Sequence, residues 1–526
     1  MNLKDFNAPQ KGPSSRLYWV LVVLLALIAA LTRTLYLNEW PIAIHNDESA
    51  CAIYCVPPFL GSNPDAALWG FSSYGGHSNL GPWLSSLAVK LLGENTLWAS
   101  RIAAATSGTI SIILFTLFVL YGFGARTSLF FLACVIPFHL HLHYSRTGFT
   151  YIHAVLFTAI VSLAFVRFAR IPSKLNAFVI GAVLGLSVMV YSATHVLPGA
   201  VFIGTMAIFL SPTFRERYPK KQIISAFVLS SVAVLGLLTT LGAQLIYIYE
   251  HGFSSRLNSQ YLLLPGSVAY WRSKLGEQAS ILEILWHNLL QTLKFFYWQD
   301  GAGQYGFFGA PLEWCSGGLA IIGLCVLIWK GWLRDPIALF LLTMAALIII
   351  GSTLVIEANF SPHLIAFSLL IPLGCALGWE AILKAVRLNS VVLVTVITAI
   401  LVVIWADWNW RYYSEINRRK VTRDMWILRL PIAQETVRQI INLSSENADL
   451  RESFYQLIYP QSERIAVIPS DPTRQLSELL AAKSCPCLAI IDQANAEAVA
   501  NSLRGAGRGF EEHTRELGKE TVFFIH

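Results

Sequence analysis

The sequence predicts a polytopic α-helical membrane protein with about eleven transmembrane helices, followed by a small C-terminal α/β domain. Three observations predict this class. Charged residues make up 13% of the 526 residues and hydrophobic residues 55%, whereas soluble domains carry about 25% charged residues. The charge deficit lies almost entirely before residue 407, and the remaining stretch has an ordinary composition. The net charge of +7 comes from short basic clusters between apolar runs. Such clusters are typical of membrane orientation signals and do not indicate a nucleic-acid-binding face.

Apolar runs long enough to cross a bilayer recur along the chain. A hydrocarbon core of roughly 30 Å requires about 20 apolar residues per helix. Suitable runs lie at about 17–37, 99–121, 127–143, 152–168, 176–192, 195–211, 223–246, 315–333, 336–356, 364–382 and 390–406. The first run is long for a signal peptide, and Arg33-Thr34-Leu35 offers no small-residue cleavage site, so we interpret it as an uncleaved span. Gly181 and Gly185 form a small-xxx-small pair, which indicates close helix packing.

Basic residues in the short loops predict the orientation of these spans. Lys4, Lys11 and Arg16 precede the first span, and basic residues recur in every second loop after it. Those in the loops are Arg126, Arg167, Arg170, Lys174, Arg215, Arg217, Lys220, Lys221, Lys330, Arg334, Lys384 and Arg387. The short loops around 191–195 and 357–363 contain no Lys or Arg. We therefore expect a cytoplasmic N-terminus, an extracytoplasmic C-terminus and, from the compact loops, a bacterial inner (plasma) membrane.

The chain divides into a membrane module, residues 1–410, and an extracytoplasmic α/β domain, residues 411–526. Two long outer loops, 38–98 and 247–314, contain many aromatic residues, which favours ordered elements at the membrane surface. In the tail, strand-like runs at 454–459, 464–468, 488–491 and 522–525 alternate with helical patterns near 433–443, 473–482 and 493–504. The tail contains no phosphate-binding loop or metal-ligand spacing, and its role is not predicted.

Asp47 and Glu48, in the segment His45-Asn46-Asp47-Glu48 after the first span, are the most informative polar residues. Adjacent carboxylates beside a membrane can be plain solvated loop residues. The functional alternative is that one carboxylate activates a substrate hydroxyl while its neighbour orients a ligand. Neighbouring side chains of an extended segment point apart, so two separate roles fit better than one shared proton.

Three other predicted outer-side features could complete a site. They are His77, the pair Tyr144 and Arg146 at the end of the third span, and His363 at the start of the tenth. Arg146 could be an interfacial anchor, or its guanidinium could bind two phosphate oxygens. His77 and His363 could be metal ligands, but isolated histidines are more often hydrogen-bonded structural residues.

In this order and topology, the motifs resemble those of the GT-C superfamily of membrane glycosyltransferases. They are most similar to the branch of protein O-mannosyltransferases and aminoarabinose transferases, which includes bacterial lipopolysaccharide-core transferases. The resemblance covers residues 1 to about 410. It is carried by Asp47-Glu48, Gly76-His77, Gly81-Pro82-Trp83-Leu84, Gly93-Glu94, Arg101-Ile102, Ser145-Arg146, Asp300, Gly309-Ala310-Pro311-Leu312, Pro362-His363 and Pro372.

The resemblance implies a GT-C fold and an inverting hexosyl- or pentosyltransferase. Such an enzyme moves a sugar from a polyprenyl-phosphate donor to an acceptor hydroxyl on the outer face. It implies Asp47 as the general base and Glu48 as a residue that holds substrate. The candidates for binding the donor phosphate and substrate are Arg146, His77, His363, Tyr144 and Arg101. The acceptor would be a glycan, lipid or protein.

The sequence departs from the family pattern at two positions, and the group that would bind the donor phosphate has two candidates. Where the aminoarabinose branch has Glu-Lys-Pro, this chain has Ser78-Asn79-Leu80-Gly81-Pro82, which does not match the lysine phosphate contact and the acidic metal ligand of that branch. Many relatives also have an arginine near the position of His363. Arg146 is the candidate for stabilising the departing phosphate, with a divalent cation, Mg or Mn, as the alternative. The lipid tail would lie in a groove among the spans.

Two other classes of function remain open. A transporter or flippase would place ionisable residues near the bilayer midplane and often repeats its halves. Here the span interiors are nearly free of charge, Glu357 and Glu380 lie at span ends, and the two halves show no repeat. A non-catalytic envelope assembly protein that kept the fold is the third possibility. The clustering of reactive residues on one predicted side favours the enzyme.

Overall fold

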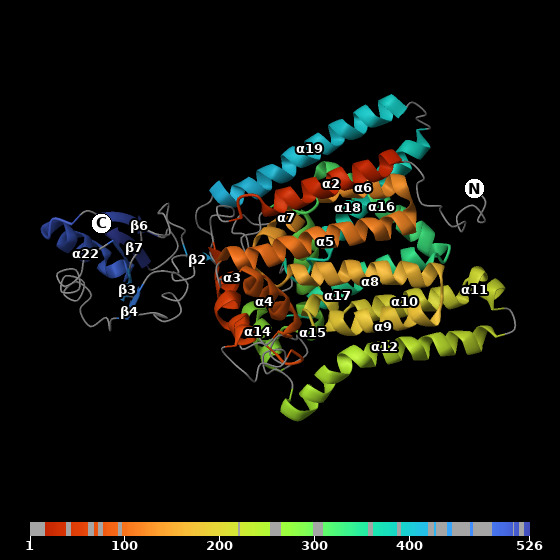
Figure 1. Ribbon diagram of the computed structural model, residues 1–526, viewed down its shortest axis with the longest axis horizontal. Helices are drawn as coiled ribbons and strands as arrows, with labels where there is room; N and C mark the ends of the chain where they lie inside the picture. The colour runs from red at the N-terminus through yellow and green to blue at the C-terminus, as the bar shows by residue number, and fades with distance from the viewer. Residues whose placement is uncertain are drawn as a thin grey trace.

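The computed structural model describes most of the membrane module and the sheet of the tail (Figure 1). The described residues are 16–37, 44–61, 68–71, 77–92, 97–218, 221–252, 265–297, 309–355, 361–386, 391–418, 425–427, 439–443, 463–466, 486–508, 510–514 and 520–525. Every predicted span coincides with helical structure. The helices concerned are α2 (Arg16–Thr34), α5 (Leu97–Phe123), α6 (Ala125–Val135), α7 (His139–Arg146), α8 (Ile152–Arg170), α9 (Lys174–Val188), α10 (Leu197–Leu210), α12 (Gln222–His251), α16 (Trp314–Trp332), α17 (Pro336–Thr353), α18 (Phe367–Ala385) and α19 (Val391–Arg418).

Seven helices in the described part of the chain are long and apolar enough to cross a membrane. An eighth span results if α6 and α7, which are bent by 62°, are counted together. The predicted span at 127–143 is therefore two helices, and Pro137 lies between them, where proline cannot continue a helix without losing a hydrogen bond. The predicted class, a polytopic α-helical membrane protein with a small α/β tail, is confirmed. The number of eleven spans stays a prediction.

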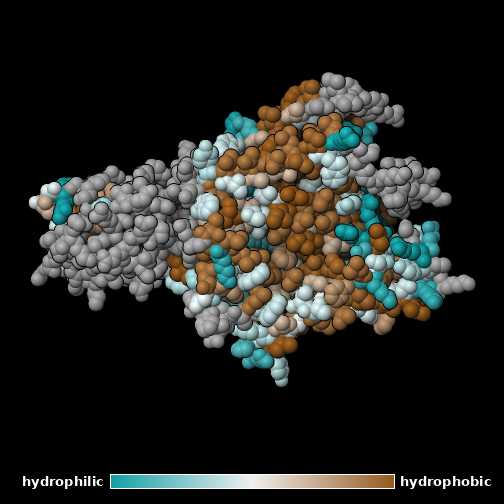
Figure 2. Space-filling view, in the orientation of Figure 1, coloured by the Kyte–Doolittle hydropathy of each residue, from teal (hydrophilic) through white to brown (hydrophobic). Residues whose placement is uncertain are grey.

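The interior and the surface of the helical body are both apolar. Phe115, Phe131, Phe165 and Phe340 are completely buried, and the rings of the last two stack 4.5 Å apart. The outward faces expose large apolar side chains, and Figure 2 shows them as a broad brown area over the helices. A soluble protein rarely exposes a contiguous apolar surface of this kind, so this surface is a membrane-facing one.

The two ends of the helical body differ in charge and in structure. One end, the α11 end, carries the short helix α11 (Pro212–Arg217) with Arg215 and Arg217, and hydrophilic residues gather there in Figure 2. Lys330 lies 5.0 Å from the ring of Phe123 at the junction of α5 and α6, so this basic loop residue shares that junction with Arg126. The alternation of basic loops predicted from the sequence agrees with this arrangement.

The opposite end, the α3 end, carries the short elements of the two long loops (Figure 1). These are α3 (Asn46–Ala50), the π-helix at Cys51–Cys55, the 3-10 helix at Pro57–Leu60, α4 (Leu80–Leu92), α14 (Pro265–Leu275) and α15 (Ile281–Tyr297). Asn288 of α15 is buried and donates hydrogen bonds to the carbonyls of Thr353 and Val355 after α17. The prediction that these loops contain ordered elements is confirmed for the described residues.

Glycines allow two pairs of helices to approach closely. At Gly181 and Gly185 of α9, a Cβ atom would collide with the backbone of α12 at Ala233 and Leu237. At Gly378 of α18, a Cβ atom would meet the backbone of α16. The packing role predicted for Gly181 and Gly185 is therefore confirmed.

The tail contains a five-stranded sheet in the order β4-β3-β5-β7-β6. Its elements are β3 (Gln439–Leu443), β4 (Glu463–Ala466), β5 (Cys487–Asp492), α22 (Gln493–Gly505), β6 (Phe510–Thr514) and β7 (Glu520–Ile525). Strand β3 pairs in parallel with β4 and β5, whereas β7 is antiparallel to β5 and β6. The strands at 464–468, 488–491 and 522–525 and the helix at 493–504 were predicted in these places.

One predicted element of the tail is wrong, and others lie outside the described residues. A helix was predicted near 433–443, but residues 439–443 form the strand β3. The reason is that the β-branched Ile440 and Ile441 are buried within the sheet. The runs at 454–459 and 473–482 lie outside the described residues. Helix α19 continues past residue 410 to Arg418, and β2 (Met425–Ile427) pairs with β1 (Ile44–His45), the strand that precedes Asp47. The domain division at 410 stays a prediction.

Candidate functional site

Asp47 lies in the first turn of α3, directly after β1. Its side chain is half-buried, and the hydroxyl of Tyr151 donates a hydrogen bond of 2.9 Å to its Oδ2 atom. Tyr151 is the N-cap residue of α8, so a long helix fixes the hydrogen bond that orients this carboxylate. A partly exposed and oriented carboxylate can accept a proton from a hydroxyl group bound beside it.

Glu48 has a different environment from its neighbour. It is completely buried and forms a bidentate ion pair with Arg101, at 2.7 Å from Oε1 to Nε and 3.2 Å from Oε2 to Nη2. The backbone N–H of Gly148 donates a third bond of 2.6 Å to Oε1, and Arg101 also donates to the carbonyl of Leu37. Glu48 and Arg101 thus join three chain segments and hold the loop that carries Asp47.

Tyrosine and histidine rings surround the Asp47–Tyr151 pair. The ring of Tyr191 lies 4.8 Å from that of Tyr151, 5.1 Å from His77 and 6.5 Å from His363. Burial and the nearby Asp47 carboxylate raise the pKa of Tyr191, so its hydroxyl stays protonated at neutral pH. Residues from five separate segments of the chain therefore meet at this point.

Tyr144 joins the same cluster from α7. It is completely buried, its ring lies 6.2 Å from that of Tyr151, and its hydroxyl shares a hydrogen bond with Ser361, two residues before His363. The structure thus gathers the predicted residues Asp47, His77, Tyr144 and His363.

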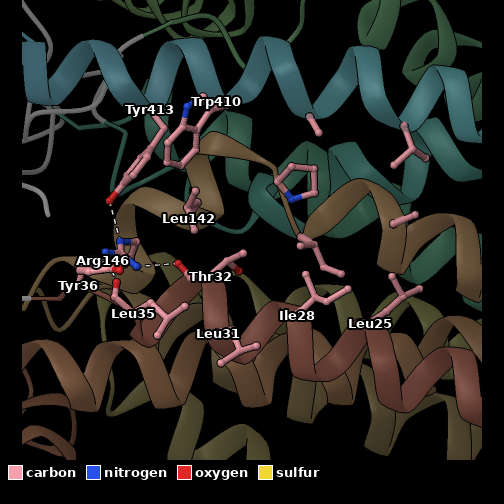
Figure 3. Close-up of a pocket in the computed structure, with 15 residues that line it drawn as sticks. Leu25, Ile28, Leu31, Thr32, Leu35, Tyr36, Leu142, Arg146, Trp410 and Tyr413 are labelled. Atoms are coloured by element: carbon pink, nitrogen blue, oxygen red, sulfur yellow. Dashed lines mark hydrogen bonds between the residues drawn. The ribbon is translucent and has the colours of Figure 1, made fainter.

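A membrane-facing groove has Arg146, two residues after Tyr144, in its lining (Figure 3). It has a volume of about 840 Å³ and lies between α2, the α6–α7 bend and α19. Its lining is almost entirely apolar and includes Leu25, Ile28 and Leu31 of α2 and Val402 and Trp410 of α19. We call this cavity the lipid-facing groove. The part of α2 that lines it, from Leu25 to Leu35, is roughly 15 Å long at a rise of about 1.5 Å per residue.

Arg146 lies at one end of the lipid-facing groove, at the end of α7 (Figure 3). Its Nε donates a 2.7 Å hydrogen bond to the hydroxyl of Tyr413. Its Nη1 and Nη2 donate to the carbonyls of Thr32 and Leu35, at 2.6 and 2.7 Å. The guanidinium is 5% exposed, so its positive charge sits at the head of an apolar cavity.

A short segment connects the groove to Asp47. Arg146 ends α7, Gly148 binds Glu48 and Tyr151 binds Asp47, all within six consecutive residues. Arg146, which could hold a ligand, is therefore only five residues before Tyr151, the residue that orients Asp47. Arg146 and Asp47 themselves belong to two neighbouring parts of the site.

Sequence reasoning missed three residues of this region: Tyr151, Tyr413 and Arg33. Tyr151 follows Arg146 by five positions in the same predicted loop, which was an available signal. Tyr413 comes after the last predicted span, and nothing in the sequence connects it to Arg146. Of the motifs named above, Gly76, Gly93, Glu94, Asp300 and Glu357 lie outside the described residues.

The described residues do not fit a divalent cation. Among them, no group of three or more His, Cys, Asp or Glu side chains is close enough to hold a metal ion. Glu48, the acid next to Asp47, is already bound by Arg101 and Gly148. His77 and His363 pack against Tyr191, and no metal-ligand set forms around them. No chemical step is therefore derived through a metal.

No protein-family model and no curated protein sequence matches the chain. Several solved structures resemble it. The oligosaccharyltransferase of Archaeoglobus fulgidus, in complex with Zn and sulfate, has a TM-score of 0.48 and 14% identity over 95% of this chain and 72% of that chain. ArnT from Cupriavidus metallidurans, bound to undecaprenyl phosphate, has a TM-score of 0.44 and 12% identity over 96% and 97%.

A third solved structure is the protein O-mannosyltransferase complex of S. cerevisiae bound to its sugar donor. It has a TM-score of 0.33 and 15% identity over 47% of this chain and 35% of that chain. All three are GT-C glycosyltransferases, members of the superfamily that the sequence motifs resemble.

Proposed function

We propose that this protein is an integral membrane glycosyltransferase that moves a sugar from a polyprenyl-phosphate donor to an acceptor hydroxyl. The observation that carries the proposal is the lipid-facing groove, an apolar cavity of about 840 Å³ that ends at the guanidinium of Arg146. An isoprenoid chain fits such a cavity because it brings no polar group against the apolar lining and makes dispersion contacts with it. A phosphate at its head is a natural partner of an arginine, whose fork matches two phosphate oxygens.

The reaction we propose is a single displacement with inversion. The acceptor oxygen attacks the anomeric carbon while the bond from that carbon to the phosphate oxygen breaks. Asp47 accepts the proton of the acceptor hydroxyl, and Tyr151 keeps the carboxylate oriented. The departing polyprenyl phosphate carries the electron pair of the broken bond, and Arg146 stabilises its charge. General-base assistance of this kind contributes about 10²–10⁴ in rate.

The remaining predicted residues receive supporting roles. His77, Tyr144 and His363 surround Asp47 with rings and hydrogen-bonding groups, the surroundings in which a sugar or an acceptor would be held. Glu48 and Arg101 hold the Asp47 loop rather than substrate, since they bind each other and the backbone. We place the site on the extracytoplasmic face of a bacterial inner membrane, with the N-terminus in the cytoplasm, because of the basic loops.

The test is mass spectrometry of cell-envelope glycans, glycolipids and glycoproteins in three strains: with the gene, without it, and with Asp47→Asn. We expect one sugar to be missing without the gene, and equally missing or reduced at least about 100-fold in Asp47→Asn. Asp407→Asn, which removes an exposed carboxylate of α19, is the control and should leave the sugar in place.

Protein levels must be equal in the variants for this comparison. A complete product in Asp47→Asn would overturn Asp47 as the base. Identical envelopes with and without the gene would overturn the glycosyltransferase itself and favour an assembly protein.

A further inference from the structure

Arg33 lies in the last turn of α2 and is completely buried in the helical body. It forms no ion pair with a carboxylate in the described part of the chain; its hydrogen-bond partners are oxygens and one histidine nitrogen. Its Nη1 and Nη2 donate to the carbonyl of Ile136, each at 3.3 Å, and Nη2 donates to the carbonyl of Val135 at 3.4 Å. The burial of a charge is costly, so these hydrogen bonds must compensate for the lost hydration of the guanidinium.

The carbonyls that Arg33 binds lie at the break between α6 and α7. A helix leaves its last four carbonyls without intrahelical partners, and its C-terminal end has a partial negative charge. The proline at position 137 prevents the chain from continuing as one helix across this break. Arg33 therefore caps the end of α6 and stabilises the 62° bend that begins there.

Arg33 also holds the first turn of α7 through His141. Its Nη2 lies 3.1 Å from Nδ1 of His141, whose Nε2 lies 3.1 Å from the hydroxyl of Ser111 in α5. Arginine can only donate, so Nδ1 must be the acceptor and Nε2 must carry the proton. The hydroxyl oxygen of Ser111 accepts a hydrogen bond from this Nε2–H, and the same hydroxyl donates a hydrogen bond to the carbonyl of Gly108. The network is satisfied when His141 is neutral, and it ties α2, α5 and α7 together.

Arg146 makes the reverse connection. It extends from α7 to the carbonyls of Thr32 and Leu35 at the end of α2, whereas Arg33 extends from α2 to the end of α6. Thr32 touches both, because its hydroxyl accepts from Arg33 at 3.0 Å and its carbonyl accepts from Arg146 at 2.6 Å. The orientation of Arg146 at the groove head thus depends on the helix end that Arg33 fixes.

We propose that Arg33 is a positioning residue of the donor site: it fixes the α6–α7 bend and the guanidinium of Arg146 and adds a second positive charge behind the groove head. The proposal rests on the proposed function, which places a lipid phosphate at Arg146. Both guanidiniums bind Thr32, so two like charges lie close together behind the groove head, and a bound phosphate relieves their repulsion. Arg33 therefore favours an anionic lipid over a neutral lipid of the same length without touching it.

The experiment measures binding of undecaprenyl phosphate and of undecaprenol, the same lipid without phosphate, to the full-length purified protein. The readout is the part of the tryptophan fluorescence change that disappears in Trp410→Phe, because Trp410 lines the groove and is one of 16 tryptophans in the chain. The variants are Arg33→Met, Arg33→Lys and the control Arg126→Met. Arg126 lies at the opposite end of α6, over the ring of Phe130, so its loss changes the net charge equally.

We expect Arg33→Met to weaken binding of the phosphate at least about tenfold, the loss expected if a displaced Arg146 gives up one charge-assisted hydrogen bond to it, and to leave undecaprenol binding nearly unchanged. Arg33→Lys keeps the charge but binds fewer carbonyls, so we expect an intermediate loss. Arg126→Met should match the wild type. An equal loss for both lipids, or no loss for either, would overturn the proposal, since a merely structural role does not discriminate the phosphate.

The outcomes also separate this inference from the proposed function. If the wild type binds neither lipid, the proposed donor site is wrong. If the wild type prefers the phosphate and both Arg33 variants keep that preference in full, the site stands and the role of Arg33 is wrong. Should Arg33→Met fail to fold, the comparison of Arg33→Lys with Arg126→Lys decides in the same way.

Discussion

Two helix pairs at opposite edges of the helical body are held together in different ways (Figure 1). Helices α9 and α12 meet at glycines, so that backbone touches backbone and a single added Cβ would collide. Helix α2 and the α6–α7 bend are bridged by two arginines: Arg33 of α2 donates to carbonyls at the end of α6, and Arg146 of α7 donates to carbonyls at the end of α2. Glycine contacts leave no space between helices, whereas arginine bridges hold the helix ends apart.

The difference shows how one membrane body contains both a scaffold and a site. Close glycine packing gives dispersion contacts along a long seam, the main attraction available between helices in lipid. The arginine-bridged side leaves an apolar cavity that opens toward the membrane, and the bridging charge stands at its head. A hydrocarbon chain can fill an apolar groove that is open to lipid, because no polar group has to be desolvated when the chain enters.

The largest effect we predict tests the buried charges of the site. Glu48→Gln would leave Arg101 buried without its anion, which costs about 3–5 kcal/mol. We expect a large drop in the Tm of the purified protein in detergent, together with the loss of activity that follows from a displaced Asp47 loop. Glu216→Gln, at an exposed acid of α11, should change stability by less than about 0.5 kcal/mol. Equal Tm values for the two variants would show that the ion pair does not hold this loop.

The second prediction concerns the glycine seam. Gly181→Ala places a Cβ atom 2.7 Å from the carbonyl carbon of Ala233, and such overpacking costs about 1–3 kcal/mol. Gly242→Ala in α12 is the matched control, because nothing lies within 4 Å of the added Cβ there. We expect it to be neutral or slightly stabilising, since alanine is the better helix former by about 1 kcal/mol. If both variants change stability by the same amount, the close contact at Gly181 does not stabilise this helix pair.

Much of this comparison could be predicted from the sequence, because the signals involved are local. The four-residue spacing of Gly181 and Gly185 is by itself enough to predict close helix packing. Asp47 and Glu48 stand out as acids beside an apolar run. Their different environments could not be predicted, because the partners lie far away in the sequence. Glu48 pairs with Arg101, 53 positions away, and Asp47 accepts a hydrogen bond from Tyr151, 104 positions away.

The groove was expected only in general terms. Its walls come from α2, α6–α7 and α19, segments at the two ends of the module, and no local pattern reports that they face each other. Arg33 lies near the end of the first predicted span, where an arginine usually extends toward the interface. Only the break at position 137 gives it carbonyls to bind inside the body. The predicted helix at 433–443 failed for a related reason, because sheet neighbours override local helix propensity.

The third prediction fills the groove. Ala406 lines it from α19, and Ala406→Trp would occupy part of the space that the donor tail needs. We expect KM for the lipid donor to rise about tenfold, equivalent to about 1.4 kcal/mol, with the Tm little changed. Val403→Trp adds the same side chain three residues earlier, at a position that is 67% exposed to lipid, and should leave KM unaltered. Identical KM values in both variants would place the donor tail elsewhere.

The smallest effect concerns Glu313, at the N-cap of α16, which packs through glycines against α18. In the described part of the chain, Glu48 and Glu313 are the two buried acids. Glu313 is 9% exposed, and its Oε1 has no hydrogen-bond partner in the described part of the chain. Burial raises its pKa from 4.5 to about 8. A raised native pKa means that the folded state prefers the protonated form. Its contribution to stability is therefore complete below about pH 4.5 and is lost as the pH rises to about 8.

Glu313→Gln keeps the shape of the protonated acid and cannot ionise, so the variant should be more stable than the wild type at pH 8.5 and nearly equal to it at pH 5. Thermal unfolding at both pH values measures this difference, and Glu277→Gln, at an exposed position after α14, controls for the loss of one charge. A pH dependence that is unchanged in Glu313→Gln would mean that this acid has a partner outside the described residues. In that case the glycine-packed pair of α16 and α18 would contain a paired charge of its own, and glycine packing and buried charge would not be confined to separate parts of the helical body.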